Sequence, residues 1–200
     1  GDDFTLAQEL VLGVGGTRIL DELGYEVDTY HMNEGHAAFL TAELLARNDM
    51  DEAAVRERCA FTTHTPVEAG HDEFDWDLVE EMVTDPVAPE DLRPFSHDAG
   101  LNMSLLALNL SSYANSVAKK HQEVSRTMFP EFEIDAITNG VHVPYWIGDA
   151  FGDVYDEHIS GWRENPYKFK HATVIPDADL WEAHQAQKRE TIEFINEREG

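Results

Sequence analysis

The sequence has little cysteine and lysine, and it has no long apolar run. Cys59 is the only cysteine in 200 residues, so no disulfide can form within the chain, and we expect a buried, inert thiol in a cytoplasmic protein. No apolar run approaches the roughly 18–20 residues that cross a bilayer, and no basic start followed by an apolar block marks a signal peptide. The chain opens on Gly1 within a helix-like pattern, so we expect it to be a piece of a longer protein.

Positive charge is also scarce. Lysine and arginine together number 14 against 40 aspartates and glutamates, which gives a net charge of −26 at pH 7. A surface this acidic repels nucleic acid and anionic membranes, so we expect neither as a partner. The acidic residues are spread between well-formed apolar segments, which argues against disorder. An acidic excess with so few lysines predicts adaptation to high salt, where self-repulsion is screened.

Helical and strand periodicities alternate along the chain. Strands are predicted over residues 25–32, 59–63 and 134–137. Helices are predicted over residues 6–23, 37–48, 51–58, 74–84, 101–110, 113–129, 152–159 and 176–199. Strands separated by helices predict an α/β fold with a parallel sheet.

The glycines of the stretch "GVGG" resemble half of a dinucleotide-binding fingerprint. However, no predicted strand precedes Gly13, and Arg18 stands where the third glycine belongs. We therefore interpret these glycines as points of close packing against a neighbouring element.

All three predicted strands run into polar residues. These residues are Asn33, Glu34, Gly35 and His36 after the first strand, Thr63, His64 and Thr65 at the second, and Thr138, Asn139, Gly140 and His142 after the third. Ligands of parallel α/β sheets bind just past the carboxyl ends of the strands. The sequence therefore predicts one polar pocket, built from residues far apart along the chain.

The residue types in this pocket indicate the class of ligand. Asparagine, threonine and neutral histidine both donate and accept hydrogen bonds, which suits a polyhydroxyl ligand such as a sugar. A phosphate would favour arginine, lysine or a glycine-rich cradle. Glu34 is a candidate general base or a partner for a sugar hydroxyl.

A metal site is the main competing interpretation. The residue types are right for zinc or iron at His31, His36, His64, His71 and Glu34. Their spacing forms no HExxH or HxH motif, so we expect no metal ion.

A serine–histidine site is less well supported. Ser125 and His121 lie one helical turn apart without a GxSxG motif. His121 falls on an apolar stripe, which is typical of a hydrogen-bonded core histidine.

Each pocket motif also has a structural explanation, and at this point both remain open. The stretch "NEGH" can cap the helix that follows it. Thr65 precedes Pro66 and can simply be held extended, and Asn139 and Gly140 can form a turn.

The motifs, taken in order, resemble those of the α-glucan (glycogen, maltodextrin and starch) phosphorylase family. The matching stretches are "YHMNEGHAAFLTAELL", "FTTHTPVEAGHDEF", "MSLLALNLSSYANSVAKKHQEVSRTMF" and "ITNGVHVPYWIG", together with the opening "LAQELVLGVGGTRIL". The resemblance implies a Rossmann-like fold of the glycosyltransferase-B type, with two domains facing a cleft. Residues 1–144 would be the C-terminal half of the N-terminal domain, and residues 145–200 the inter-domain crossover and the helical start of the C-terminal domain.

The same resemblance implies the reaction and its participants. The full-length enzyme would cleave terminal glucosyl units of an α-1,4-glucan with inorganic phosphate to give glucose 1-phosphate. It would use pyridoxal phosphate and could form a homo-oligomer. The cofactor lysine of the family lies outside the matching stretches, and no cofactor-binding residue falls in this chain. We therefore expect the 200-residue piece alone to be inactive.

The resemblance also assigns roles to individual residues. His64 would be the catalytic contact to the glucosyl unit, which its side chain would touch at the hydroxymethyl group. Asn139 would hold the same hydroxymethyl group. The glucan-binding site would be lined by Glu34 and His36. The other implied substrate-binding residues are Asn33, Asn115 and Val117. A non-catalytic carbohydrate-binding or metal-dependent α/β domain is the alternative function.

Overall fold

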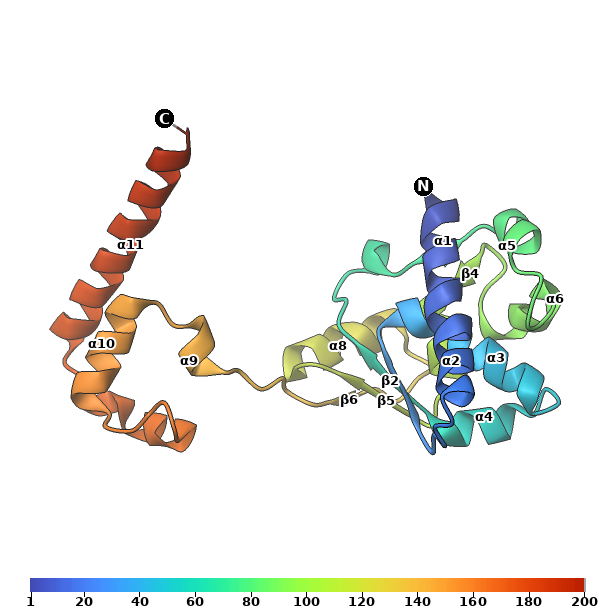
Figure 1. Ribbon diagram of the computed structural model, residues 1–200, viewed down its shortest axis with the longest axis horizontal. Coiled ribbons are helices and arrows are strands. Elements are labelled where there is room, and N and C mark those ends of the chain that lie inside the picture. Colours follow the sequence, from blue (N-terminus) through green and yellow to red (C-terminus); the bar gives the residue numbers. More distant parts are fainter. Residues whose placement is uncertain (200) are drawn as a thin grey trace. The chain divides into compact units, whose positions relative to one another are not determined.

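The computed structural model describes residues 1–199 and separates into two compact units, with the division after Asn139 (Figure 1). The first unit contains every strand found in the described residues, and the second is helical. The assignment of residues 1–144 and 145–200 to two phosphorylase domains stays a prediction.

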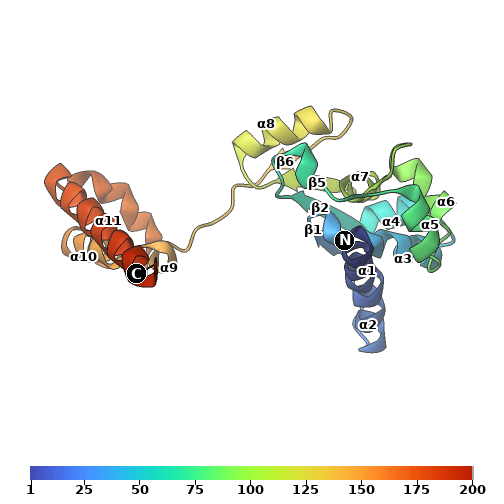
Figure 2. The same ribbon diagram turned by 90° about the horizontal axis from the view of Figure 1, so that it is seen from above.

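A four-stranded parallel sheet forms the centre of the first unit (Figure 2). Its strands lie in the order β1 (Tyr30–Asn33), β2 (Cys59–Thr63), β5 (Tyr113–Ser116) and β6 (Asp135–Ala136). All three neighbouring pairs are parallel. The predicted α/β fold with a parallel sheet is therefore confirmed.

Helices surround this sheet. They are α1 (Asp2–Leu10), the π-helix η1 (Val11–Gly15), α2 (Gly16–Glu22), α3 (Phe39–Arg47), α4 (Glu52–Arg58), α5 (Trp76–Met82), α6 (Pro89–Leu92), α7 (Met103–Asn109) and α8 (Lys119–Met128). Short 3₁₀ turns occur at η2 (Gly35–Ala37), η3 (Glu68–Gly70) and η4 (Arg93–Phe95), and β3 (Glu73–Phe74) pairs antiparallel with β4 (Leu101–Asn102).

The sheet presents one apolar row to the core. Met32 pairs in register with Phe61, and Phe61 pairs with Ala114. All three are buried and belong to the main hydrophobic cluster of the unit. Because side chains alternate between the faces of a strand, the next register positions carry a polar row on the other face.

The helices α1, η1 and α2 follow one another without a break and form the first helical rod, residues 2–22. Gly13 allows this rod to lie against α3. A Cβ atom at this position would be 2.6 Å from the backbone nitrogen of Leu40 and 2.8 Å from the carbonyl carbon of Phe39. Only a residue without a side chain fits such an approach, so close packing is confirmed at Gly13. The structure shows no such crowding at Gly16.

Several sequence predictions of local structure were wrong. Phe74, Leu101 and Asn102 were predicted to be helical but lie in β3 and β4. Residues 113–129 are not one helix, because Tyr113–Ser116 forms β5 between β2 and β6. The helical stripe that suggested one element begins at Val117 and covers only the second part of the stretch. The first predicted strand is also shorter than 25–32, since strand geometry begins at Tyr30.

The second unit consists of α9 (Val143–Trp146), α10 (Asp149–His158), the 3₁₀ segment η5 (Pro166–Val174) and α11 (Asp177–Glu199). Its small core contains Ile159, Trp162 and Ile175. The Trp162 indole N–H donates to Asp156 Oδ1 at 2.8 Å, which satisfies the polar atom of this buried ring.

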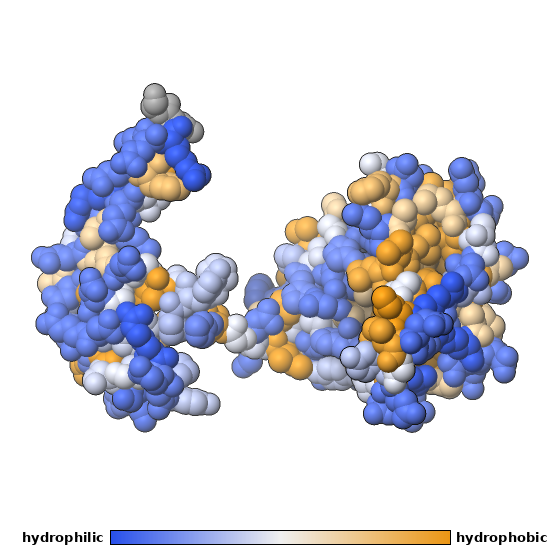
Figure 3. Space-filling view, in the orientation of Figure 1, coloured by the Kyte–Doolittle hydropathy of each residue, from blue (hydrophilic) through white to orange (hydrophobic). Residues whose placement is uncertain are grey.

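The first helical rod also carries an exposed apolar face (Figure 3). Phe4, Val11, Leu12 and Ile19 are each more than half exposed.

Within residues 1–199, no helix combines the length and the apolar character that a membrane crossing requires.

Candidate functional site

The candidate site lies where the four parallel strands end. Asn33 pairs with Thr62, Thr63 pairs with Ser116, and Ser116 pairs with Ala136. Strand partners in parallel register bring their following segments to one edge of the sheet. The polar segments after β1, β2 and β6 therefore share this edge, as does the segment after β5, which the sequence did not reveal.

Glu34 turns sharply out of β1. Its φ of 73° and ψ of 170° lie in a region that only glycine adopts readily. The backbone N–H of Glu34 still donates to the Thr62 carbonyl at 2.9 Å, so the turn begins within the sheet ladder. Backbone strain of this kind persists only where surrounding interactions maintain it.

The Glu34 side chain supplies such interactions by binding the segment after β2. Its Oε2 accepts the His64 backbone N–H at 2.6 Å and the Thr65 hydroxyl at 2.8 Å. Glu34 is 8% exposed. Its other oxygen, Oε1, is buried and has no hydrogen bond among the described residues. The carboxylate is thus directed at the protein backbone, where it fixes the position of His64.

The His64 imidazole is free for a ligand. The side chain is exposed, and among residues 1–199 no hydrogen bond or ion pair involves its ring. The structure therefore holds the His64 backbone firmly and leaves the ring available at the sheet edge.

Thr65 is held from a second direction by α8. The buried His121 Nε2–H donates to the Thr65 carbonyl at 3.0 Å, so the predicted role of His121 as a hydrogen-bonded core histidine is confirmed. His71 lies in the same region, with its Nδ1 2.7 Å from the Ser104 hydroxyl. Burial lowers the pKa of His71 below its usual value, against the opposing effect of Glu34, so its imidazole is neutral at pH 7.

The polar face of the sheet carries a continuous hydrogen-bonded row. The Thr62 hydroxyl donates to Asn115 Oδ1 at 2.8 Å, and the Asn115 amide donates to the Ser116 carbonyl at 3.1 Å. His31 Nε2 lies 2.7 Å from the same Thr62 hydroxyl. Because that hydroxyl has given its only proton to Asn115, His31 Nε2 must be the donor. Asn115 is 7% exposed, and its amide is occupied within the sheet.

Val117 and Asn139 are brought together by a backbone hydrogen bond. The Asn139 N–H donates to the Val117 carbonyl at 3.1 Å, while the Asn139 side chain is exposed, as is that of Asn33. The edge thus presents His64, Asn33 and Asn139 to solvent, whereas Glu34 and Asn115 face inward.

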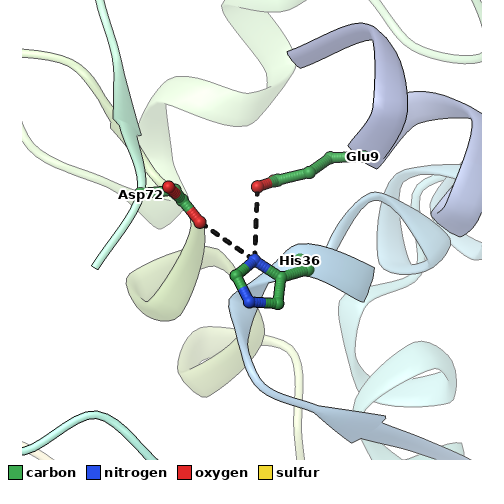
Figure 4. A group of neighbouring side chains, drawn as sticks. All are labelled: Glu9, His36 and Asp72. Carbon is green, nitrogen blue, oxygen red and sulfur yellow. Dashed lines mark ion pairs between the residues drawn. The ribbon is translucent and has the colours of Figure 1, made fainter. Parts of the chain in front are cut away.

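His36 takes part in a separate cluster (Figure 4). Its Nδ1 lies 2.9 Å from Asp72 Oδ2 and 3.5 Å from Glu9 Oε1. Burial, together with the nearby Asp72, raises the pKa of the Glu9 carboxyl to about 8. Sequence motifs did not point to Glu9 or Asp72, because neither lies in a spaced motif with His36.

The five lysines of the chain lie in both units. Lys119 and Lys120 are exposed, and Lys120 pairs with Glu123. The remaining lysines, Lys168, Lys170 and Lys188, lie in the second unit.

Comparison with known proteins shows similarity along nearly the whole chain. The maltodextrin phosphorylase of Thermococcus litoralis is 36% identical over an alignment of 221 positions, which covers 98% of this chain and 26% of that protein. The glycogen phosphorylase of Aquifex aeolicus is 32% identical over 98% of this chain and 32% of its own length. The glycogen phosphorylase of Mycobacterium tuberculosis is 36% identical over 98% of this chain and 27% of its own length.

No protein-family model matches the chain. The chain spans between 26% and 32% of the length of these three relatives. Identity of 32–36% over 98% of the chain supports its relationship to the phosphorylase family. The chain is therefore homologous, over almost its whole length, to a segment of the glycogen and maltodextrin phosphorylases.

Proposed function

We propose that the complete protein is an α-1,4-glucan phosphorylase, and that this chain supplies part of its glucosyl- and glucan-binding site. The enzyme would release glucose 1-phosphate from chain ends with inorganic phosphate. The proposal is supported by the similarity over 98% of the chain to proteins named phosphorylases. The edge of the sheet agrees with it, since it offers neutral hydrogen-bonding side chains to a ligand.

His64 is the residue on which the proposed site depends most. Its backbone N–H is fixed by a buried carboxylate at 2.6 Å, while its ring is exposed. This combination suits a side chain that binds a sugar hydroxyl, because the backbone that carries the ring loses little conformational freedom on binding. Asn139 would contact the same glucosyl unit through its exposed amide, and Asn33 would add a further polar contact.

Glu34 and Asn115 would act on the substrate indirectly. The Glu34 carboxylate already holds the segment that contains His64, and the Asn115 amide is hydrogen-bonded within the sheet. We therefore give both a positioning role. Val117 would shape the edge through its backbone, because its carbonyl fixes Asn139.

The cofactor would come from outside the residues of this chain. We propose that the complete protein uses pyridoxal phosphate, held by a lysine and phosphate-binding residues that this chain does not supply. The protein would be cytoplasmic, in keeping with its single, buried cysteine, and a homo-oligomer is compatible with the family.

Phosphorolysis of maltodextrin tests the assignment. The complete protein, supplied with pyridoxal phosphate, should release glucose 1-phosphate only when inorganic phosphate is present. His64→Ala should lower kcat strongly and leave cofactor absorbance unchanged. His97→Ala is a matched control, because His97 is also partly exposed and lies beside a carboxylate, that of Glu73.

Two outcomes would contradict the proposal. Maltodextrin binding without any phosphate-dependent product would favour a non-catalytic carbohydrate-binding domain. Normal turnover of His64→Ala would remove His64 from the substrate site.

A further inference from the structure

We infer that Glu9, His36 and Asp72 form a binding site for one divalent transition-metal ion, for which Zn²⁺ is the best match. The three side chains come from α1, from η2 and from the segment just before β3. Figure 4 shows that both carboxylates point toward the His36 ring. This inference is independent of the proposed phosphorylase activity.

The separations between the ligand atoms suit a single ion. One ligand atom from each of the three residues lies within 4.8 Å of the other two. His36 Nδ1 is 2.9 Å from Asp72 Oδ2 and 3.5 Å from Glu9 Oε1. Two ligands that each lie about 2.1 Å from a tetrahedral zinc ion are about 3.4 Å apart, so only small side-chain movements are needed to bind it.

Glu9 gives a second and independent reason to expect a cation. The residue is 3% exposed, and within residues 1–199 neither of its carboxylate oxygens has a hydrogen bond. A buried carboxylate without hydrogen bonds is costly, and proteins normally pair it or use it to bind a metal. Without a metal ion the buried Glu9 carboxyl, beside Asp72, has its pKa raised to about 8, so it holds a proton near neutral pH. A divalent ion would replace that proton and balance the charges of both carboxylates.

The surroundings allow an ion to enter and to keep a further ligand. The three residues border a hollow of about 320 Å³ that is also lined by Thr5, Gln8 and Leu12. The His36 side chain is 55% exposed and that of Asp72 is 31% exposed, so two ligands are accessible from solvent. Three protein ligands with one open position are typical of zinc sites that bind water or a substrate oxygen.

The competing arrangement contains no metal. In that arrangement the proton stays on Glu9, and His36 pairs with Asp72 at 2.9 Å. The two arrangements differ in their response to Zn²⁺, because the ion pair gains nothing from it. The sequence predicts no metal ion, because His31, His36, His64, His71 and Glu34 form no HExxH or HxH motif. Glu9 and Asp72 were not among the residues on which that prediction rested.

Direct titration of the purified protein tests the site. After treatment with EDTA and its removal, the protein should bind one Zn²⁺ per chain, measured by competition with a chromophoric chelator. Bound Co²⁺ should give visible absorption bands. Glu9→Gln, His36→Asn and Asp72→Asn should each weaken Zn²⁺ binding by at least about tenfold, because even the loss of a residue that only hydrogen-bonds to a metal ligand has an effect of that size.

Glu73→Gln is the matched control, because Glu73 pairs with His97 in a partly exposed contact at 3.4 Å. It should leave Zn²⁺ affinity unchanged. Glu9→Gln preserves side-chain shape, and its folding can be checked by circular dichroism. Equal Zn²⁺ binding by the natural protein and by all three folded variants, or no binding above that of surface histidines, would overturn the inference.

Discussion

Replacing Glu34 by alanine and by glycine separates its two structural contributions. Alanine removes the carboxylate that accepts the His64 N–H and the Thr65 hydroxyl, yet keeps a Cβ at a φ of 73°. Glycine removes the same carboxylate and also relieves the backbone, because it adopts this conformation without steric penalty.

The sizes of these effects follow from the contacts. A hydrogen bond to a charged group contributes about 1.5–3 kcal/mol, so the loss of both bonds lowers the free energy of unfolding of Glu34→Ala by about 3–6 kcal/mol. The strained backbone costs about 1–3 kcal/mol. Glu34→Gly should therefore be more stable than Glu34→Ala by about 1–3 kcal/mol, while both remain less stable than the natural protein.

Urea unfolding of the three proteins checks this order, with Thr65→Val as an intermediate that loses only the hydroxyl contact. Under the proposed function, Glu34→Gly in the complete protein should also lower kcat for glucose 1-phosphate release, because the His64 segment loses its support. If the alanine and glycine variants unfold at the same urea concentration, the φ of Glu34 stores no strain. If both match the natural protein, the carboxylate does not stabilise the segment.

Three further predictions concern the core and the surface. Gly13→Ala should lower the free energy of unfolding by about 1–3 kcal/mol, because the new methyl group overpacks against α3. Gly16→Ala has no atom within 4 Å of the new Cβ and should raise the free energy of unfolding by about 0.5–1 kcal/mol. Equal effects of the two substitutions in urea unfolding would contradict the close approach at Gly13. Burial raises the pKa of Cys59 to about 12, so an aromatic disulfide reagent at pH 8 should react only in urea. Rapid modification of Cys59 in the folded protein would refute its burial. The raised pKa also means that the stability gained from the neutral thiol is present below pH ~8.5 and is lost as pH rises toward about 12. With a net charge of −26, the free energy of unfolding should increase between 0.1 M and 1 M KCl, because the screening length falls from about 10 Å to about 3 Å; equal stability at both concentrations would rule out the proposed adaptation to high salt.

The sequence was sufficient for the fold class but not for every strand. Helical stretches such as Glu52–Arg58 carry their own start signal, and Asp51 indeed caps that helix through the N–H groups of Ala53 and Ala54. The four residues of β5 carry no alternation long enough to distinguish them from the helix that follows. They form a strand because β2 and β6 pair with them on both sides, which is a tertiary effect that local pattern cannot show.

The sequence predicted that polar strand ends share one edge of the sheet, but it did not predict the directions of their side chains. The ends of the first two predicted strands do meet at one sheet edge, and the residue types were correctly recognised as polar. What the motif "NEGH" could not show is that the positive φ of Glu34 turns its carboxylate inward, toward the backbone of residues 64 and 65. Nor could it show that His36, two residues later, lies against Glu9 and Asp72 rather than beside Glu34.

The position of His64 therefore depends on segments that no motif search around it would include. Thr65, its neighbour, is hydrogen-bonded both to Glu34, 31 residues earlier, and to His121, 56 residues later. These two contacts hold opposite ends of the residue, its hydroxyl and its carbonyl, so removal of either leaves the other in place. A ligand that needs the His64 ring in one orientation would then be most sensitive to loss of Glu34, because only that residue also holds the His64 N–H. Substitutions at His121 should affect stability more than turnover, and this difference would separate a support of the loop from a support of the reacting group.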